Sequence, residues 1–100
     1  MERMTKVMIR HNEEERKFFT TVEGVECTLK YIKWNDLVWD FISSFIPQTL
    51  KQASELRSTI VEYALNFAKT KNARIKASCS CVQDFLVEHP EYRSLIYYPY

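Results

Sequence analysis

The chain of 100 residues contains one glycine, Gly24, and this constrains its fold and its sites more than any other feature. The phosphate-binding loops of the Rossmann and P-loop types need several glycines, because the backbone must come close to the phosphates. The nucleophile elbow of the α/β-hydrolases needs a pair of them. The sequence therefore excludes all three kinds of site.

The composition predicts one folded domain that spans residues 1–100. Apolar residues make up 46% of the chain and there are only 3 prolines, so a core can form. The net charge of +1 argues against nucleic acid as a partner. The most apolar stretch, residues 37–46, is interrupted by Asp40, Ser43 and Ser44 and is shorter than the ~20 residues of a membrane span, so no membrane partner is expected.

The cysteines and the start of the chain predict a cytoplasmic location. The total of 3 cysteines is odd, which suits reduced thiols better than a disulfide framework. The first residues also lack the apolar region of a secretory signal.

Alternating apolar residues predict strands in the first half of the chain. Glu23 and Gly24 supply a two-residue hairpin loop, in which Gly24 is free to adopt a positive φ. Residues 37–46 are apolar on both faces, which predicts a strand covered on both sides and ended by Pro47. The predicted strands are residues 7–9, 16–22, 25–33, 37–46 and 73–77.

The apolar spacing changes after Pro47 and predicts a long helix over residues 49–72, followed by a short one. Thr49 and Gln52 have the spacing of a capping box at the start of the long helix, as do Ser80 and Gln83 at the start of a second helix that reaches Glu88. The residues on the apolar stripe of the long helix are Ala53, Leu56, Ile60, Ala64, Phe67 and Ala68.

The order of these elements predicts the fold class. A crossover through the long helix makes the strands at residues 37–46 and 73–77 parallel, whereas the hairpins make the others antiparallel. The fold is therefore expected to be an α+β sandwich, with a bent, mixed and mostly antiparallel sheet, one long helix and one short helix.

Three motifs in residues 16–96 carry a family resemblance. They are Val-Glu-Tyr-Ala-Leu-Asn-Phe-Ala at residues 61–68, Ala-Ser-Cys-Ser-Cys-Val at residues 77–82 and His-Pro-Glu-Tyr at residues 89–92. With them the chain resembles the small, single-domain GCN5-related N-acetyltransferases, which bind coenzyme A. The resemblance implies an acyl-CoA N-acyltransferase-like fold whose fourth and fifth strands splay apart around the pantetheine arm of acetyl-CoA.

The resemblance also implies where the cofactor binds. The family has Arg-Gly-x-Gly after the proline, whereas here Lys51 takes the Arg position and Gln-Ala-Ser-Glu at residues 52–55 replaces the glycine pair. Backbone groups at Phe45 and Ile46 would hold the thioester arm. The implied cofactor-binding residues are Phe45, Ile46, Lys51, Gln52, Ala53, Ser54, Glu55 and Leu56.

The lost glycines leave two interpretations open. Amides at a helix N-terminus suit a diphosphate, but side chains at residues 52–54 would hinder its approach and Glu55 would repel it. A capping box at Thr49 would also occupy the amides. The chain is therefore either an acetyl-CoA-dependent N-acetyltransferase or a non-catalytic relative that keeps the fold and acts as an interaction module.

Cys79 is the catalytic residue that the resemblance implies, because this cysteine lies near the acyl group in the family. A thiolate just before a helix would also be stabilised by the helix N-terminus. A cysteine at a strand end is equally a packing residue, and Cys79 with Cys81 could instead form a reactive-thiol sensor. His89 is a candidate base for Cys79, or else a residue that ends the helix.

The remaining candidates concern partners. The Cys and His spacing does not match a zinc site, so no metal is expected. The cationic residues Lys69, Lys71, Arg74 and Lys76 suit either a 3′-phosphate or a solvated helix end. Tyr97, Tyr98 and Tyr100 suit internal packing or a subunit contact, which leaves a monomer or a weak homodimer. The acceptor would be the amine of a small molecule or a protein.

Overall fold

The computed structural model describes residues 8–97 of the chain. Five strands, two α-helices and one 3₁₀ helix follow one another along these residues. In chain order they are β1 (Arg10–Asn12), β2 (Lys17–Val22), β3 (Val25–Asn35), β4 (Val38–Phe45), α1 (Ala53–Thr70), β5 (Arg74–Ala77), α2 (Ser80–Glu88) and η1 (Pro90–Leu95).

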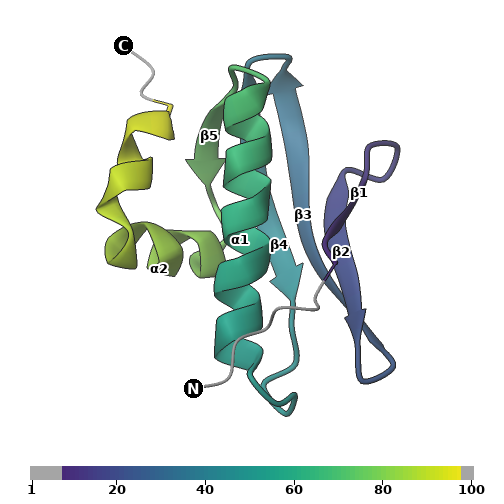
Figure 1. Cartoon of the computed structure of the whole chain (residues 1–100). Helices are drawn as coiled ribbons and strands as arrows, with labels where there is room; N and C mark the ends of the chain where they lie inside the picture. Colours follow the sequence, from purple (N-terminus) through teal and green to yellow (C-terminus); the bar gives the residue numbers. More distant parts are fainter. Residues whose placement is uncertain (1–7, 98–100) are drawn as a thin grey trace.

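The strands form one sheet in the order β1-β2-β3-β4-β5. The first four strands are antiparallel neighbours, and β5 is parallel to β4 because α1 connects them (Figure 1). The prediction of a mixed α+β sheet with one parallel pair is confirmed.

The β2–β3 hairpin has the predicted two-residue loop. Glu23 and Gly24 both have a positive φ, 53° and 77°, between the paired residues Val22 and Val25. Positive φ at both central residues defines a type I′ turn, whose twist matches that of the flanking strands.

Helix α1 covers one face of the sheet, and α2 lies beside it (Figure 1). The predicted stripe of α1 is buried, apart from the half-buried Phe67. Beneath it, Leu29 of β3 and Phe41 of β4 are fully buried, and Tyr31 stacks on Trp39 with ring centroids 5.0 Å apart. We call this the helix face of the sheet and the opposite one the far face.

The first strand was predicted at residues 7–9 but lies at Arg10–Asn12; Val7 is outside the described residues. The difference comes from His11, whose ring stacks on Phe18 at 4.2 Å and whose Nε2 lies 2.6 Å from the Tyr31 hydroxyl. This polar residue is thus held in the aromatic core, and it and its neighbours pair in register with β2.

The prediction that residues 37–46 are covered on both sides is half wrong. Val38 to Phe41 are buried, whereas Ile42 to Phe45 are exposed. The reason is that β5 pairs only with the first half of β4 and ends at Ala77.

Neither predicted capping box forms. Helix α1 begins at Ala53 rather than Thr49, and Gln52 precedes it in a left-handed conformation, with no side-chain cap hydrogen bond among residues 8–97. At α2 the N-cap is Cys79 rather than Ser80, and the side-chain amide Nε2 of Gln83 donates to the carbonyl of Ala77 over 2.8 Å. A backbone turn over residues 47–52 thus separates Thr49 from the first helical turn.

The segment that begins at Pro90 packs beside β5. It forms η1, after which the Tyr97 amide donates to the carbonyl of Ile75 over 2.8 Å, beside β5. The predictions for Tyr98 and Tyr100 lie outside the described residues.

Candidate functional site

Strands β4 and β5 separate to form a fork. Their parallel pairing ends at Phe41 and Ala77, but β4 continues to Phe45. The amide of Cys79 donates to the carbonyl of Phe41 over 2.8 Å and so closes the base of the fork. Beyond this point, no described strand pairs with that edge of β4, and its backbone groups are open to a ligand.

The second part of the site is the start of α1. Two of the predicted amides are bonded within the chain: Ala53 donates to Leu50 over 3.3 Å and Leu56 donates to Gln52 over 2.9 Å. The amides of Gln52, Ser54 and Glu55 have no acceptor among the described residues. Unpaired amides together with the helix dipole favour an anion at this position.

Gln52 has the backbone conformation of a glycine. Its φ is 60°, a region that residues with a Cβ adopt at a cost of roughly 1–2 kcal/mol. It follows Lys51 directly and occupies the place of the first glycine of the family motif. The turn before α1 therefore has a left-handed residue although it contains no glycine.

The charges around this turn oppose one another. Lys51 is exposed and can reach an anion, whereas Glu55 lies in the first turn of α1. The carboxylate of Glu23, from the β2–β3 hairpin, accepts a hydrogen bond from the Lys51 amide over 3.3 Å. This contact between residues 28 positions apart has no signal in the sequence, and it places a carboxylate where a phosphate would bind.

The third part of the site is a pair of thiols at the base of the fork. Cys79 is 6% exposed, and its Sγ lies 3.5 Å from the Ser44 hydroxyl. Ser44 is paired with Leu29, so both groups lie on the helix face. Burial raises the pKa of Cys81, and the neighbouring Cys79 adds to this, whereas Ser44 and Arg57 partly offset it. A raised pKa keeps Cys81 a thiol at neutral pH.

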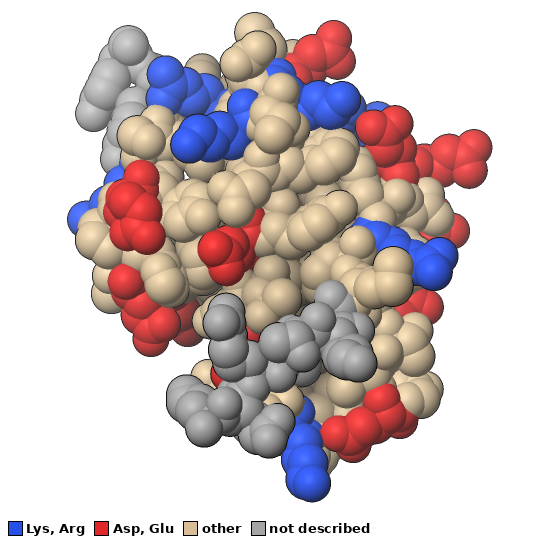
Figure 2. Space-filling view, viewed as in Figure 1, with Lys and Arg blue, Asp and Glu red and all other residues tan. Residues whose placement is uncertain are grey.

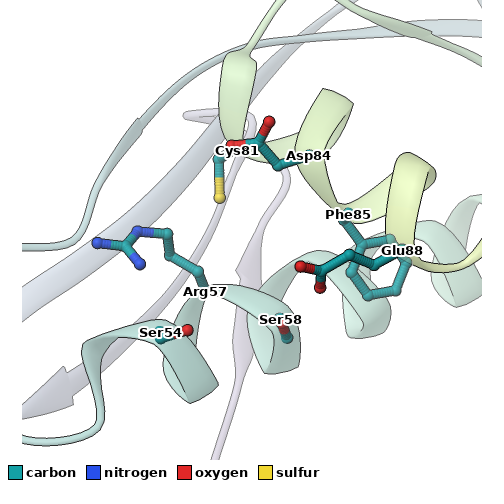
Figure 3. Close-up of a pocket in the computed structure, with 7 residues that line it drawn as sticks. All are labelled: Ser54, Arg57, Ser58, Cys81, Asp84, Phe85 and Glu88. Atoms are coloured by element: carbon teal, nitrogen blue, oxygen red, sulfur yellow. The ribbon is translucent and has the colours of Figure 1, made fainter.

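A cavity of about 140 Å³ lies between the first turns of α1 and one side of α2. Figure 3 shows its walls facing each other from the two helices. The lining residues are Ser54, Arg57 and Ser58 of α1 and Cys81, Asp84, Phe85 and Glu88 of α2. The cavity is smaller than the ~300 Å³ of a typical ligand pocket, so it suits part of a ligand.

His89 does not reach Cys79. The two residues flank opposite ends of α2, and the His89 ring stacks on Phe85 at 4.3 Å, with its Nδ1 3.6 Å from the carboxylate of Glu91. The structure therefore places His89 as the residue that ends the helix. Among residues 8–97 no three His, Cys, Asp or Glu side chains lie close enough to hold a metal ion.

The cationic residues lie at the other end of α1 from the candidate anion site. Blue side chains gather there in Figure 2, where α1 ends and β5 begins. The 18 residues of α1 span roughly 27 Å. Lys69 lies in the last turn of α1, and Arg74 donates to the carbonyl of Ser94. Lys69 and Arg74 thus lie away from the fork, whereas Lys76 pairs in register with Asp40 next to its base.

Comparisons with known proteins show the family of the chain. The model of the family described as GCN5-related N-acetyl-transferase matches residues 17–95. The chain therefore belongs to the GCN5-related N-acetyltransferase family. That membership supports an acetyltransferase-like function, and the family generally binds acetyl-CoA.

A solved structure shares the fold. The solution structure of a protein from Staphylococcus aureus that is assigned as a GCN5-like N-acetyltransferase superposes with a TM-score of 0.72. The alignment covers 97% of this chain and 94% of that one at 16% sequence identity. No curated protein matches the chain. No helix within residues 8–97 is long and apolar enough to cross a membrane.

Proposed function

We propose that the chain is an acetyl-CoA-dependent N-acetyltransferase. The observation that carries the proposal is the uncapped start of α1, where three amides without a described acceptor lie beside a turn in the left-handed conformation. Three such groups suit the oxygens of a diphosphate, so the residues present fit the cofactor.

Each part of the site then has a role. Lys51 and the amides of Gln52, Ser54 and Glu55 bind the diphosphate; Ala53 and Leu56 contribute by anchoring the first helical turn in the core. The open edge of β4 up to Phe45 and Ile46 holds the pantetheine arm. Cys79, at the base of the fork, lies beside the acyl group.

Bound acetyl-CoA would supply an acetyl thioester, from which a neutral amine takes the acyl group: the C–N bond forms, the C–S bond breaks, and the proton lost by the amine nitrogen goes to the leaving sulfur, so that coenzyme A is released as the thiol. The chain contributes by holding the donor and by excluding water from the fork. Cys79 is buried and lies next to Ser44, so it lines the acyl position from the helix face.

Calorimetry with acetyl-CoA and the full chain tests the proposal. We expect binding with 1:1 stoichiometry. Ser54→Pro removes one amide in the first helical turn and should weaken binding about tenfold, since a hydrogen bond to a charged group contributes ~1.5–3 kcal/mol. Ser54→Ala keeps that amide and is the matched control. Absence of heat at millimolar acetyl-CoA would overturn the proposal.

The role of Cys79 is tested separately. If its sulfur attacks the acyl carbon, Cys79→Ala abolishes turnover while acetyl-CoA still binds. Cys81→Ala, two residues further along the chain, is the control. Unchanged turnover in Cys79→Ala rejects the nucleophilic role and leaves direct transfer to the amine.

One observation favours the second candidate, a non-catalytic interaction module. The Glu23 carboxylate already occupies the amide of Lys51, as an internal substitute for an anion. If both the wild-type chain and Glu23→Gln fail to bind acetyl-CoA, the interaction module is the better description.

A further inference from the structure

A buried carboxylate lies at the fork on the far face of the sheet. Asp40 of β4 is 6% exposed, and its Oδ2 accepts a hydrogen bond from the Ser78 hydroxyl over 3.1 Å. Its Oδ1 is buried and has no hydrogen-bond partner among the described residues. Such a group is costly to the fold and is rarely left without a function.

The nearest cation does not neutralise this carboxylate. Lys76 is the direct cross-strand neighbour of Asp40, yet no described residue forms an ion pair with Asp40. The Lys76 ammonium lies instead 3.6 Å from the centroid of the Trp34 ring and 6.0 Å from that of Tyr97. The far face thus already holds one ammonium on aromatic rings, while the adjacent carboxylate stays available to another.

Exposed apolar side chains lie on β4 and on the neighbouring strand β3. Ile32 is the other cross-strand neighbour of Asp40 and is 41% exposed, and Ile42 and Phe45, further along β4, are 40% and 57% exposed. An apolar surface that adjoins a carboxylate is complementary to a cation that carries an apolar body.

The position of Asp40 relates it to the acyl end of the site. Asp40 directly precedes Phe41, the last residue of β4 that pairs with β5, and Ser78 directly follows Ala77. The Asp40–Ser78 hydrogen bond therefore lies at the base of the fork on the far face, whereas Cys79 and Ser44 lie at the same place on the helix face. A ligand on the far face would meet the acyl group from the opposite side.

We propose that the far face binds the acceptor as a primary ammonium on an apolar or aromatic body, with Asp40 as its anionic partner. The identification of this ligand as the acceptor rests on the proposed function; the binding itself does not. Asp40 lies between Ile32 and Lys76 in the register of the sheet, and its Oδ1 is buried. We therefore expect the Lys76 side chain to move aside when an ammonium enters, and its loss should ease binding.

An NMR titration of the full chain with 2-phenylethylammonium chloride tests the site, with uncharged 2-phenylethanol as the matched ligand. We expect shifts at Ile32, Trp34 and Ile42 with the amine and binding at least tenfold weaker with the alcohol. Asp40→Asn keeps the shape and the bond from Ser78, and it should weaken amine binding at least tenfold. Asp36→Asn, in an exposed turn, should leave it unchanged.

Lys76→Met gives a second, independent reading, because it changes a half-buried residue at the surface and removes the competing charge. It should strengthen amine binding about threefold. Equal binding by the wild type, Asp40→Asn and Lys76→Met would overturn the proposal, as would shifts confined to the helix face. Calorimetry with acetyl-CoA is run on the same samples. If the amine binds and acetyl-CoA does not, the transferase is rejected. If acetyl-CoA binds and the amine does not, the acceptor site is rejected.

Discussion

Both ends of α1 are flanked by a residue in the left-handed conformation, but only the C-terminal end has its backbone groups bonded within the chain. Gln52 before the helix and Asn72 after it have positive φ values of 60° and 59°. At the C-terminal end, the amides of Lys71 and Ala73 both donate to the carbonyl of Ala68, over 3.0 and 2.9 Å, and Asn72 donates to Lys69 over 3.0 Å. At the N-terminal end, three amides have no acceptor among residues 8–97.

The two ends of α1 therefore differ in whether their backbone groups are already bonded within the chain. The C-terminal end satisfies its own carbonyls and is surrounded by cations, which suits a helix end that only has to be stable. The N-terminal end keeps a strained residue and leaves donors unused, although a Ser, Thr, Asp or Asn cap would stabilise it by ~1 kcal/mol. The open end therefore has backbone donors to offer an anion, which the closed end does not.

The largest expected effect comes from the core beneath each end. Leu56→Ala and Leu65→Ala each remove a fully buried side chain and should lower the free energy of unfolding by ~3 kcal/mol, as measured by urea denaturation. Leu56 anchors the first turn, so its variant should also lose acetyl-CoA affinity, whereas folded Leu65→Ala should bind like the wild type. Equal acetyl-CoA affinities in the two variants would contradict the proposed difference between the two ends of α1.

A smaller effect is expected at the strained residue. Gln52→Gly relieves the left-handed strain and should raise the free energy of unfolding by ~0.5–1 kcal/mol. It should also strengthen acetyl-CoA binding, because a Cβ no longer faces the phosphates. Asn72→Gly is the control at the closed end and should change stability less, since asparagine tolerates this conformation. Weaker acetyl-CoA binding in Gln52→Gly would contradict the assigned role of the turn.

Glu23→Gln sharpens the comparison further, because it removes only the charge that faces the open end. Acetyl-CoA affinity should rise a few-fold, and the stability should change by less than ~0.5 kcal/mol. Glu14→Gln, in the exposed turn between β1 and β2, provides the control. An unchanged acetyl-CoA affinity in Glu23→Gln would show that the Glu23 carboxylate does not hinder binding at the turn.

The smallest change in stability is expected from a drop in pH, and it should act near the C-terminal end of α1. Burial lowers the pKa of His11, with Glu13 opposing and Lys33 and Lys71 adding to the shift. The unfolded chain therefore takes up the proton first, at about pH 6.5, and stability should fall from there until the lower folded pKa is passed.

Urea denaturation at pH 7.5 and pH 5 measures this loss. The His11→Phe variant should lose less stability between the two conditions, because the other titrating groups are shared. A loss equal to that of the wild type would remove His11 as the cause. The His11 ring lies 4.6 Å from Phe67, near the end of α1, so the start of the helix should be unaffected.

Much of the architecture could be predicted, because it follows from local patterns. The period of two in β3 and the stripe of α1 both correspond to buried faces. The helix starts were predicted less well: Thr49 and Ser80 have capping spacing but are not caps, since the backbone conformations of Gln52 and Cys79 decide where each helix begins.

The site could be predicted only in part. The family motifs pointed to Lys51 and Cys79, and the structure places them at the start of α1 and at the base of the fork. Glu23, Ser44 and Asp40 had no such signal, because each acts through a partner that is distant in the sequence: Lys51, Cys79 and Ser78 respectively.

The sequence by itself determined the class of fold and the family, since apolar period, hairpin loop and motif are properties of neighbouring residues. Only the tertiary structure decided that the turn without glycines keeps free amides, and that a buried carboxylate lies behind the thiols. Hydrogen bonds and burial depend on which distant groups meet, and that is settled only when the helix and the strands pack together.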